Sequence, residues 1–434
     1  MVRSSIGKGE YLVDQNNDKG LTRREFLKAA GVTAAGVMVS SLATSPVYSV
    51  APMRVLGAND RINVGFIGVG GQGLRHVQAV MSLAESMNVQ PVAVCDIWNK
   101  RKMQAAKEGK VAANKIYHDY RKLLEDKDVD VVLIGTPEHW HAKIATDALE
   151  SGRACYIEKP MTRTLDEALK LRATVTRTKG VVQVGSQGCS AAIWRRANQL
   201  IKDGKIGKVV WSQGSYCRNS KDGEWNYPID PEANESNLDW KTWLGNCKPR
   251  AWDPRRYFRW RKFSDYSAGI LSDLFPHRLH PLMVALGPEY PKHVACIGTI
   301  VAHPDRDVAD NTQMLVEFPS GSTMVIAGAT CNEKGLDDVI RGNKASIYFG
   351  GNKIDIKPER PYVDEIDPYQ ENVEGAAGSM TDHWRNFLEA IRTNGKPNCD
   401  IDLATKVQVI VSLAEMSWQK GKMIEFDPVK MKVV

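Results

Sequence analysis

Short apolar runs alternate with segments of helical periodicity in the first part of the chain. The run at 62–67 leads directly into a glycine-rich turn and then into a helical pattern. Further apolar runs, separated by helical patterns such as 142–150 and 165–178, occupy 92–96, 129–134 and 154–157. This alternation predicts an α/β fold, with a doubly wound parallel sheet over residues 60–180 that carries helices on both faces.

A different pattern begins after residue 180. Segments of period two, typical of antiparallel strands, occupy 292–301, 313–318 and 323–327, and Pro319-Ser320-Gly321 predicts a hairpin between the last two. Short strands are expected at 181–184, 346–349 and 423–426, and helices at 193–201, 382–392 and 403–419. Residues 181–434 are therefore expected to form a second α/β domain with an open, mainly antiparallel sheet.

The N-terminal region has the features of an export signal. Thr22-Arg23-Arg24-Glu25-Phe26-Leu27-Lys28 matches the twin-arginine motif at every position, and small residues follow as far as Ala51. A surface amphipathic helix fits less well, because the segment after Lys28 has no polar face of helical period. We expect residues 1–51 to be a signal peptide and processing region that is recognised by the twin-arginine export machinery, which makes the mature protein periplasmic or otherwise exported.

Composition and charge limit the classes of partner that the protein is expected to bind. With 43% apolar and 25% charged residues, the chain is typical of folded protein and unlike a disordered tail. The net charge of +7 comes without a basic run, so no nucleic-acid partner is expected. The longest apolar stretch, 29–43, is shorter than the roughly 20 residues of a membrane-spanning helix, so no stable membrane insertion is expected. Eight cysteines without a C-x-x-C pair favour buried thiols over a zinc site or a disulfide framework.

The glycine-rich turn has the spacing of a dinucleotide-binding loop. Gly68 permits a tight turn, Gly70 lets the backbone approach a pyrophosphate, and Gly73 allows close packing of helix on strand. Asp96, at the end of the second strand, is suited to accept hydrogen bonds from ribose hydroxyls and would repel a 2′-phosphate, which favours NAD over NADP. The alternative is a glycine turn beneath a purely structural strand. The predicted cofactor-binding residues here are Gly68, Gly70, Gly71, Gln72, Gly73 and Asp96.

A segment rich in tryptophan and arginine lies between Cys217 and Arg261. Aromatic faces stack on sugar rings, and arginine or indole donors reach hydroxyl groups, so the segment is a candidate carbohydrate-binding region. Alternatively, the aromatic side chains pin a long loop onto the sheet. The residues concerned are Trp225, Trp240, Trp243, Trp252, Trp260, Arg250, Arg255, Arg256, Arg259 and Arg261.

Two short motifs carry candidate chemistry. Glu158-Lys159-Pro160 ends a strand of the parallel sheet, where ligands of such sheets bind, so Lys159 is expected to point toward the nicotinamide. Asp273 and His277 share a face if their segment is helical, and a carboxylate beside an imidazole fixes its tautomer and raises its basicity. A metal site that also uses His280 is less favoured, because it leaves Lys159 unexplained; no metal is predicted.

In their order along residues 60–425, these motifs resemble the glucose–fructose oxidoreductase/inositol 2-dehydrogenase (Gfo/Idh/MocA) family. The resemblance rests on the glycine loop, Thr136-Pro137 followed by His141, Glu158-Lys159-Pro160, and Asp273 with His277. It implies a Rossmann domain, an α/β domain whose open sheet mediates homodimers or homotetramers, and an NAD-dependent oxidoreductase acting on a secondary hydroxyl of a sugar, glycoside or polyol. It also places Thr136, Pro137, His141, Glu158 and Lys159 in the cofactor site and makes Lys159, Asp273 and His277 catalytic.

In the roles that the resemblance implies, His277 exchanges the hydroxyl proton, Lys159 binds the same oxygen and Asp273 orients the imidazole. Two features depart from the family pattern. The family often has Asp three residues after the catalytic His, where this chain has His280, and Pro276 and Pro281 bracket a segment that is usually continuous helix. Pro281 is expected to kink the chain there, because it removes the backbone hydrogen bond to His277.

Export affects the expected mechanism. NAD is expected to be scarce outside the cytoplasm, so the cofactor would be retained and recycled internally. The family's NAD-dependent α-N-acetylgalactosaminidase branch cleaves glycosides through transient oxidation of a ring hydroxyl, and Phe275-Pro276-His277 is similar to its Tyr-Pro-Thr-His motif with one residue missing. That branch replaces the lysine that is Lys159 here, so glycoside cleavage is the alternative to sugar oxidation. A non-catalytic exported sugar-binding protein is the second alternative.

Overall fold

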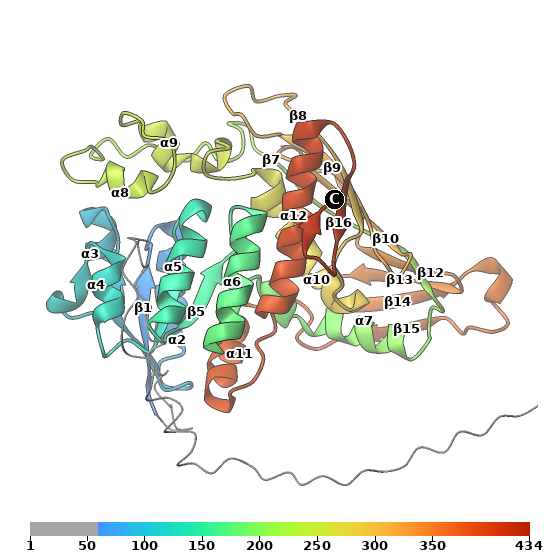
Figure 1. Ribbon diagram of the computed structural model, residues 1–434. Helices are drawn as coiled ribbons and strands as arrows, with labels where there is room; N and C mark the ends of the chain where they lie inside the picture. Colours follow the sequence, from blue (N-terminus) through green and yellow to red (C-terminus); the bar gives the residue numbers. More distant parts are fainter. Residues whose placement is uncertain (1–59) are drawn as a thin grey trace, which may run out of the picture. The chain divides into compact units, whose positions relative to one another are not determined.

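The computed structural model describes residues 60–434, and the predicted signal peptide and processing region lies outside them. The described chain contains a six-stranded sheet and an eleven-stranded sheet, each covered by helices (Figure 1). Both sheets belong to one compact unit. The predicted α/β architecture, a parallel sheet followed by a mainly antiparallel one, is confirmed.

The first sheet is entirely parallel, with the strand order β3-β2-β1-β4-β5-β6. This is the doubly wound order in which a ligand binds at the carboxyl ends of β1 and β4. Every residue of β1 is buried, which explains its continuous apolar run. The strands are β1 (Ile62–Ile67), β2 (Val89–Cys95), β3 (Ile116–Tyr117), β4 (Val131–Ile134), β5 (Ala154–Glu158) and β6 (Val182–Gly185).

The sixth strand extends this sheet beyond residue 180, where the sequence pattern placed the end of the domain. β6 pairs in parallel with β5, although its residues follow the last predicted crossover helix. The helices connecting these strands are α2 (Gly71–Ser82), α3 (Asn99–Glu108), α4 (Tyr120–Glu125), α5 (Glu138–Glu150) and α6 (Leu165–Thr178). A late helix, α11 (Met380–Thr393), buries Trp384, Phe387 and Leu388 in the same core as β1, so the chain returns to complete this domain.

The second sheet has the order β15-β14-β13-β12-β7-β10-β9-β8-β16-β17, with β11 attached to β7. The predicted hairpin joins β9 to β10. The strands are β7 (Val209–Asn219), β8 (His293–Thr299), β9 (Asn311–Glu317), β10 (Thr323–Ala329), β11 (Cys331–Asn332), β12 (Val339–Gly342), β13 (Ala345–Gly350), β14 (Lys353–Pro358), β15 (Tyr369–Asn372), β16 (Ile424–Asp427) and β17 (Lys432–Val433).

Three helices cover one face of the second sheet: α7 (Ala192–Lys202), α10 (Pro276–Leu286) and α12 (Ile401–Lys420). α12 also packs against α6 and so joins the two sheets (Figure 1). α10 continues through Pro281, where a kink was expected. The irregular backbone of this region instead precedes α10, in a π-helical turn at Ile270–Leu274. No helix within 60–434 is both long enough and apolar enough to span a bilayer.

The segment rich in tryptophan and arginine forms a cover segment, which we define as residues 220–266. It contains α8 (Trp240–Leu244) and α9 (Pro254–Phe258), which lie above α3 and α5 in Figure 1. Its buried aromatic residues form a small core of their own around Trp98, at the end of β2. Trp240 and Trp243, at most 5% exposed, belong to this small core and pack the segment, as the alternative interpretation predicts. Trp225, 2% exposed, packs into the main core instead.

Candidate functional site

The glycine loop between β1 and α2 is closely packed on one side and open on the other. Gly68 has a φ of +80°, and a Cβ there would lie 2.6 Å from the backbone nitrogen of Thr136. A Cβ on Gly73 would lie 2.1 Å from the carbonyl oxygen of Gly68. A Cβ on Gly71, by contrast, would meet nothing within 4 Å. The loop thus requires glycine at 68 and 73 for packing, and it leaves the N-terminus of α2 open for a phosphate group.

Asp96 follows β2 and is bonded to this loop. The backbone N–H groups of Val69 and Trp98 each donate to its carboxylate at 2.9 Å. Burial raises the pKa of Asp96, and the charge of Arg101 acts in the opposite direction. Because each carboxylate oxygen can accept more than one hydrogen bond, Asp96 can still accept from a ribose hydroxyl.

A cavity of about 1090 Å³ lies between the parallel sheet and the cover segment. Its size, slightly above the roughly 300–1,000 Å³ range of most small-molecule sites, suits a dinucleotide. One wall comes from the cover segment, including Tyr227–Glu232 and Tyr257. The other wall contains every predicted cofactor residue except Gly73, which packs behind the loop: Gly68, Gly70, Gly71, Gln72, Asp96, Thr136, Pro137, His141, Glu158 and Lys159.

Glu158 is held by a buried chain of hydrogen bonds that the sequence did not reveal. Its carboxylate lies 2.7 Å from Nε2 of His76, and the amide of Gln72 donates to it at 3.2 Å. The indole N–H of Trp384 donates to Nδ1 of His76 at 2.9 Å, so His76 directs its own N–H at Glu158. Burial alone would raise the pKa of Glu158, but His76, together with Lys159 and Gln72, lowers it to about 2. Glu158 is therefore ionised, and its carboxylate fixes the side-chain amide of Gln72 and the backbone N–H of Lys159.

His141 connects two turns that line the nucleotide cavity. Its ring is buried, with Nδ1 2.7 Å from the carbonyl oxygen of Pro160 and Nε2 2.8 Å from that of Thr136. The side chain thus joins the turn after β4 to the turn after β5. His139 lies 2.8 Å from the carbonyl of Trp243 and so contacts the cover segment instead.

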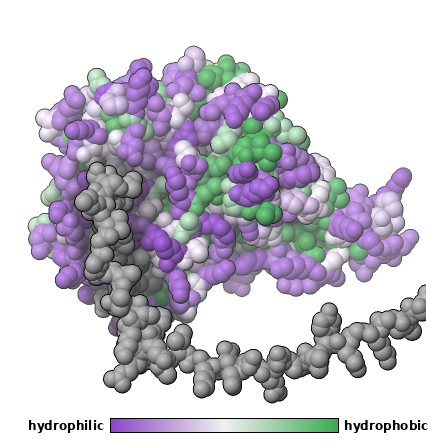
Figure 2. Space-filling view, viewed as in Figure 1, coloured by the Kyte–Doolittle hydropathy of each residue, from purple (hydrophilic) through white to green (hydrophobic). Residues whose placement is uncertain are grey.

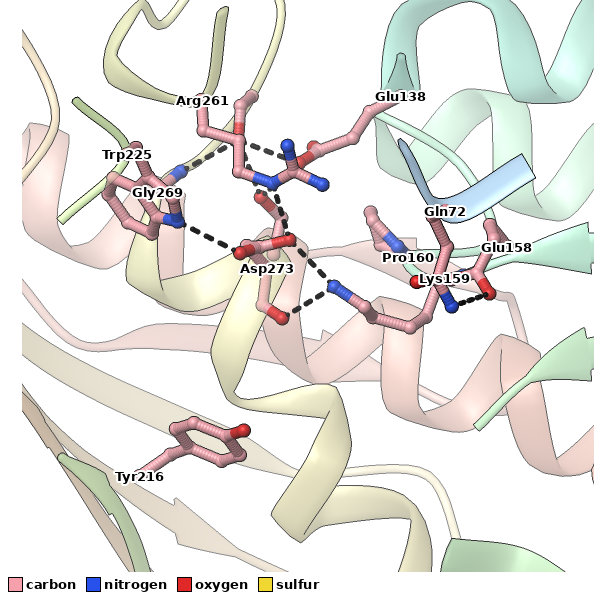
Figure 3. A network of polar contacts seen from close by, with 12 residues as sticks. Gln72, Glu138, Glu158, Lys159, Pro160, Tyr216, Trp225, Arg261, Gly269 and Asp273 are labelled. Carbon is pink, nitrogen blue, oxygen red and sulfur yellow. Dashed lines mark hydrogen bonds and ion pairs between the residues drawn. The ribbon is translucent and has the colours of Figure 1, made fainter. Parts of the chain in front are cut away.

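Lys159 and Asp273 meet at the centre of a buried polar cluster (Figure 3). The Lys159 ammonium donates to Oδ1 of Asp273 at 2.6 Å and to its backbone carbonyl at 2.8 Å. Arg261 donates from Nε to the same Oδ1 at 2.8 Å, and the indole of Trp225 donates to Oδ2 at 3.1 Å. Burial would raise the pKa of Asp273, but the charges of Arg261 and Lys159 hold it far below its usual value. Asp273 is therefore ionised.

His277 lies close to this cluster without a hydrogen bond to it. Its ring packs on Tyr216, with the centroids 5.3 Å apart, and neither ring nitrogen is hydrogen-bonded within residues 60–434. Burial and the charge of Lys159 lower the pKa of His277 to about 3, against the opposing effect of Asp273. The imidazole is thus neutral at neutral pH, and its unprotonated ring nitrogen is free to accept a proton.

The expected pairing of Asp273 with His277 is wrong. The oxygens of Asp273 accept from Lys159, Arg261 and Trp225 instead. Residues four apart share a face only in a regular α-helix, whereas Asp273 lies in a π-helical turn, whose wider winding moves it off the face of His277. Asp273 therefore positions the lysine rather than the imidazole.

Glu138 is a second buried carboxyl group that the sequence interpretation did not select. Its Oε1 accepts hydrogen bonds from the hydroxyls of Ser267, at 2.6 Å, and Ser272, at 2.9 Å. Burial raises the pKa of Glu138 to about 7. Through these serines, the first residue of α5 holds the turn that leads into Asp273.

The geometry gives no support to metal binding by Asp273, His277 and His280. Nδ1 of His280 lies 2.9 Å from the carbonyl of Pro276, and the oxygens of Asp273 are occupied as described above. Across the described residues, no group of three or more His, Cys, Asp or Glu side chains could hold a metal ion.

Family models match most of the chain. The model for an oxidoreductase family with an NAD-binding Rossmann fold matches residues 62–186, and the model for the same family's C-terminal α/β domain matches residues 220–434. The chain belongs to the Gfo/Idh/MocA oxidoreductase family. Its cofactor is NAD, the nucleotide of this Rossmann domain. The first match also ends just after β6, in agreement with the extent of the parallel sheet.

Curated relatives match only part of the chain. A glycosyl hydrolase family 109 protein of Shewanella sp. (strain ANA-3) is 35% identical over 212 residues, which is 45% of this chain and 45% of the relative. An alpha-N-acetylgalactosaminidase of Shewanella oneidensis is 29% identical over 231 residues, or 47% and 49%. The matched regions thus span less than half of these curated relatives.

Solved structures share the fold over nearly their whole length. A levoglucosan dehydrogenase in complex with NADH and levoglucosan superposes with a TM-score of 0.66 at 19% identity, covering 84% of this chain and 99% of that one. The WlbA dehydrogenase from Bordetella pertussis, in complex with NADH and UDP-GlcNAcA, gives 0.65 at 16% identity, covering 85% and 99%. These likenesses establish the shared architecture.

Proposed function

We propose that the protein oxidises a secondary hydroxyl of a sugar, glycoside or polyol, with an NAD that stays bound and is recycled within the site. The observation that carries this proposal is the neutral, unpartnered imidazole of His277 next to the Lys159–Asp273 pair, at the carboxyl end of β5. A base without an internal partner beside a fixed cation suits the removal of a hydroxyl proton. The glycine loop, Asp96 and the cavity beside them suit the nucleotide.

The chain's own residues divide the proton chemistry between them. His277 accepts the proton of the substrate hydroxyl and becomes an imidazolium. Lys159 uses two N–H groups on Asp273 and keeps its third for the substrate oxygen, where it stabilises the developing negative charge. Bound NAD supplies the acceptor for the hydride that leaves the same carbon, which becomes a ketone. Glu158 and Gln72 hold the loop and the lysine in place.

Glycoside cleavage is the second candidate, and the relatives named glycosyl hydrolase family 109 and alpha-N-acetylgalactosaminidase favour it. Oxidation of a ring hydroxyl acidifies the neighbouring C–H, and loss of that proton expels the glycosidic group. Water then adds, and the hydride returns to the ketone, so the net change is hydrolysis. Such a cycle consumes no external oxidant, and it suits a nucleotide enclosed by the cover segment.

We propose export through the twin-arginine route to the periplasm or beyond, supported by the motif at Arg23-Arg24. We also propose a homodimer or homotetramer that uses the open face of the second sheet. Ile297 of β8 is 69% exposed and Leu315 of β9 is 48% exposed on that sheet. Apolar side chains also gather on the surface where Figure 1 places β16 (Figure 2).

The test is a substrate panel applied to the purified holoprotein. Sugars, uronic acids and inositols are added while the absorbance of reduced nicotinamide is followed, and 4-nitrophenyl α-N-acetylgalactosaminide is added while nitrophenol is measured. Reduction of bound nucleotide without cleavage supports oxidation, and nitrophenol release with deuterium uptake from D2O supports cleavage. Sugar binding with neither change would contradict both and identify a non-catalytic binding protein.

A further inference from the structure

The cover segment contacts both ends of the nucleotide cavity. Near Asp96 it is attached to the parallel-sheet domain by polar contacts. The Lys100 ammonium lies 2.7 Å from Asp230 and 2.5 Å from Glu232, and Arg101 donates to the Tyr257 hydroxyl at 2.9 Å. These contacts hold the cover segment over the Asp96 end of the nucleotide cavity.

At its other end the same segment reaches Asp273, the carboxylate that positions Lys159. Arg261 and Trp225 supply two of the three side-chain donors to Asp273, and Lys159 supplies the third. Arg261 also lines the nucleotide cavity, so one side chain contacts both regions. Trp225 is 2% exposed and has a φ of +65°, a left-handed conformation that a bulky residue adopts only when its surroundings hold it there.

We propose that Arg261 and Trp225 are positioning residues that make closure of the cover segment and placement of Lys159 a single event. This rests on the catalytic role proposed above for Lys159, which Asp273 holds in place. With the cover segment closed, the buried carboxylate has three donors and holds the ammonium at a fixed point (Figure 3). With it open, Asp273 loses the Arg261 and Trp225 hydrogen bonds, and Lys159 loses its fixed anchor. The site is thus assembled only while the nucleotide is enclosed, as a retained cofactor requires.

The test measures nucleotide exchange and needs no sugar substrate. Holoprotein is mixed with excess isotopically labelled NAD, and replacement of the bound nucleotide is followed by native mass spectrometry. The variants are Trp225→Phe, which keeps the ring and removes its donor, and Arg261→Gln. Arg255→Gln is the matched control, because Arg255 is an exposed arginine of the same segment whose side chain pairs with Asp253.

Loss of one hydrogen bond to a buried carboxylate is expected to speed exchange roughly tenfold in each variant, with no change for Arg255→Gln. In a double-mutant cycle, adding Asp273→Asn should produce little further change, because the two residues act through that carboxylate. Wild-type exchange rates in both variants, or effects that simply add to that of Asp273→Asn, would overturn the inference. With a substrate from the panel, kcat should fall while KM stays nearly constant. Absence of turnover on every sugar would count against the proposed function and leave the exchange result to stand separately.

Discussion

Two neighbouring glycines of the nucleotide loop should respond in opposite ways to the same substitution. In Gly73→Ala the added methyl would lie 2.1 Å from the backbone oxygen of Gly68, so the loop and α2 must move apart. Overpacking of this kind costs about 1–3 kcal/mol, and we expect the upper end because the obstructing atom is backbone. In Gly71→Ala the methyl meets nothing within 4 Å, and alanine in place of glycine in a helix gains up to about 1 kcal/mol.

Urea unfolding of refolded, nucleotide-free protein measures the free energy of unfolding of each variant, and NADH fluorescence titration measures its affinity for the nucleotide. Gly73→Ala should be less stable by about 3 kcal/mol and should bind NADH poorly. Gly71→Ala should be as stable as the parent or more so, yet bind more weakly, because its methyl takes space at the helix N-terminus where a phosphate would sit. A Gly73→Ala protein with parental stability and affinity would refute this account of the loop.

Three further predictions concern the buried polar side chains of the site. Lys159→Ala and His277→Ala should each abolish turnover while mass spectrometry still finds bound NAD; activity retained in both would exclude the proposed site. Because the pKa of His277 is about 3, its basic form persists on acidification, so kcat/KM for hydroxyl oxidation should hold down to about pH 5; an acid limb near the ordinary imidazole value would contradict this. Burial raises the pKa of Glu138 from 4.5 to about 7, so stability is lost as pH rises through that interval, by roughly 3 kcal/mol. Glu138→Gln should therefore gain stability over the parent at pH 8 but little at pH 5, as followed by thermal unfolding.

The nucleotide domain could be predicted closely because its signals are local. Strands buried on both faces, such as β1, appear as continuous apolar runs, and α6 begins at the capping box of Thr164 and Glu167. No comparable pattern of apolar positions marks β7, the central strand of the second sheet. Its buried residues are Ser212, Gly214 and Ser215, which lie on both faces and none of which is strongly apolar, so apolar alternation is lost where the strand is most enclosed.

The residues that line the cavity wall could be predicted one by one, but the pairings of the buried polar side chains could not. Glycine spacing and strand ends indicated the cavity wall, since these features follow from the local backbone. The partner of Asp273 depended on a π-helical turn, which i, i+4 spacing cannot reveal. The chain from Trp384 through His76 to Glu158 joins residues more than 300 positions apart, and Arg261 meets Asp273 only because a long segment folds over the cleft. Such contacts arise from tertiary packing and leave no periodic trace in the sequence.

The most direct test of a retained, recycled nucleotide is the content of the protein as purified. The full chain is expressed with its N-terminal region intact, and the mature protein is isolated without added cofactor and denatured. Mass spectrometry then identifies and quantifies any nucleotide released. The account predicts NAD or NADH in nearly equimolar amount. A protein that releases no nucleotide and fails to bind added NAD would contradict it.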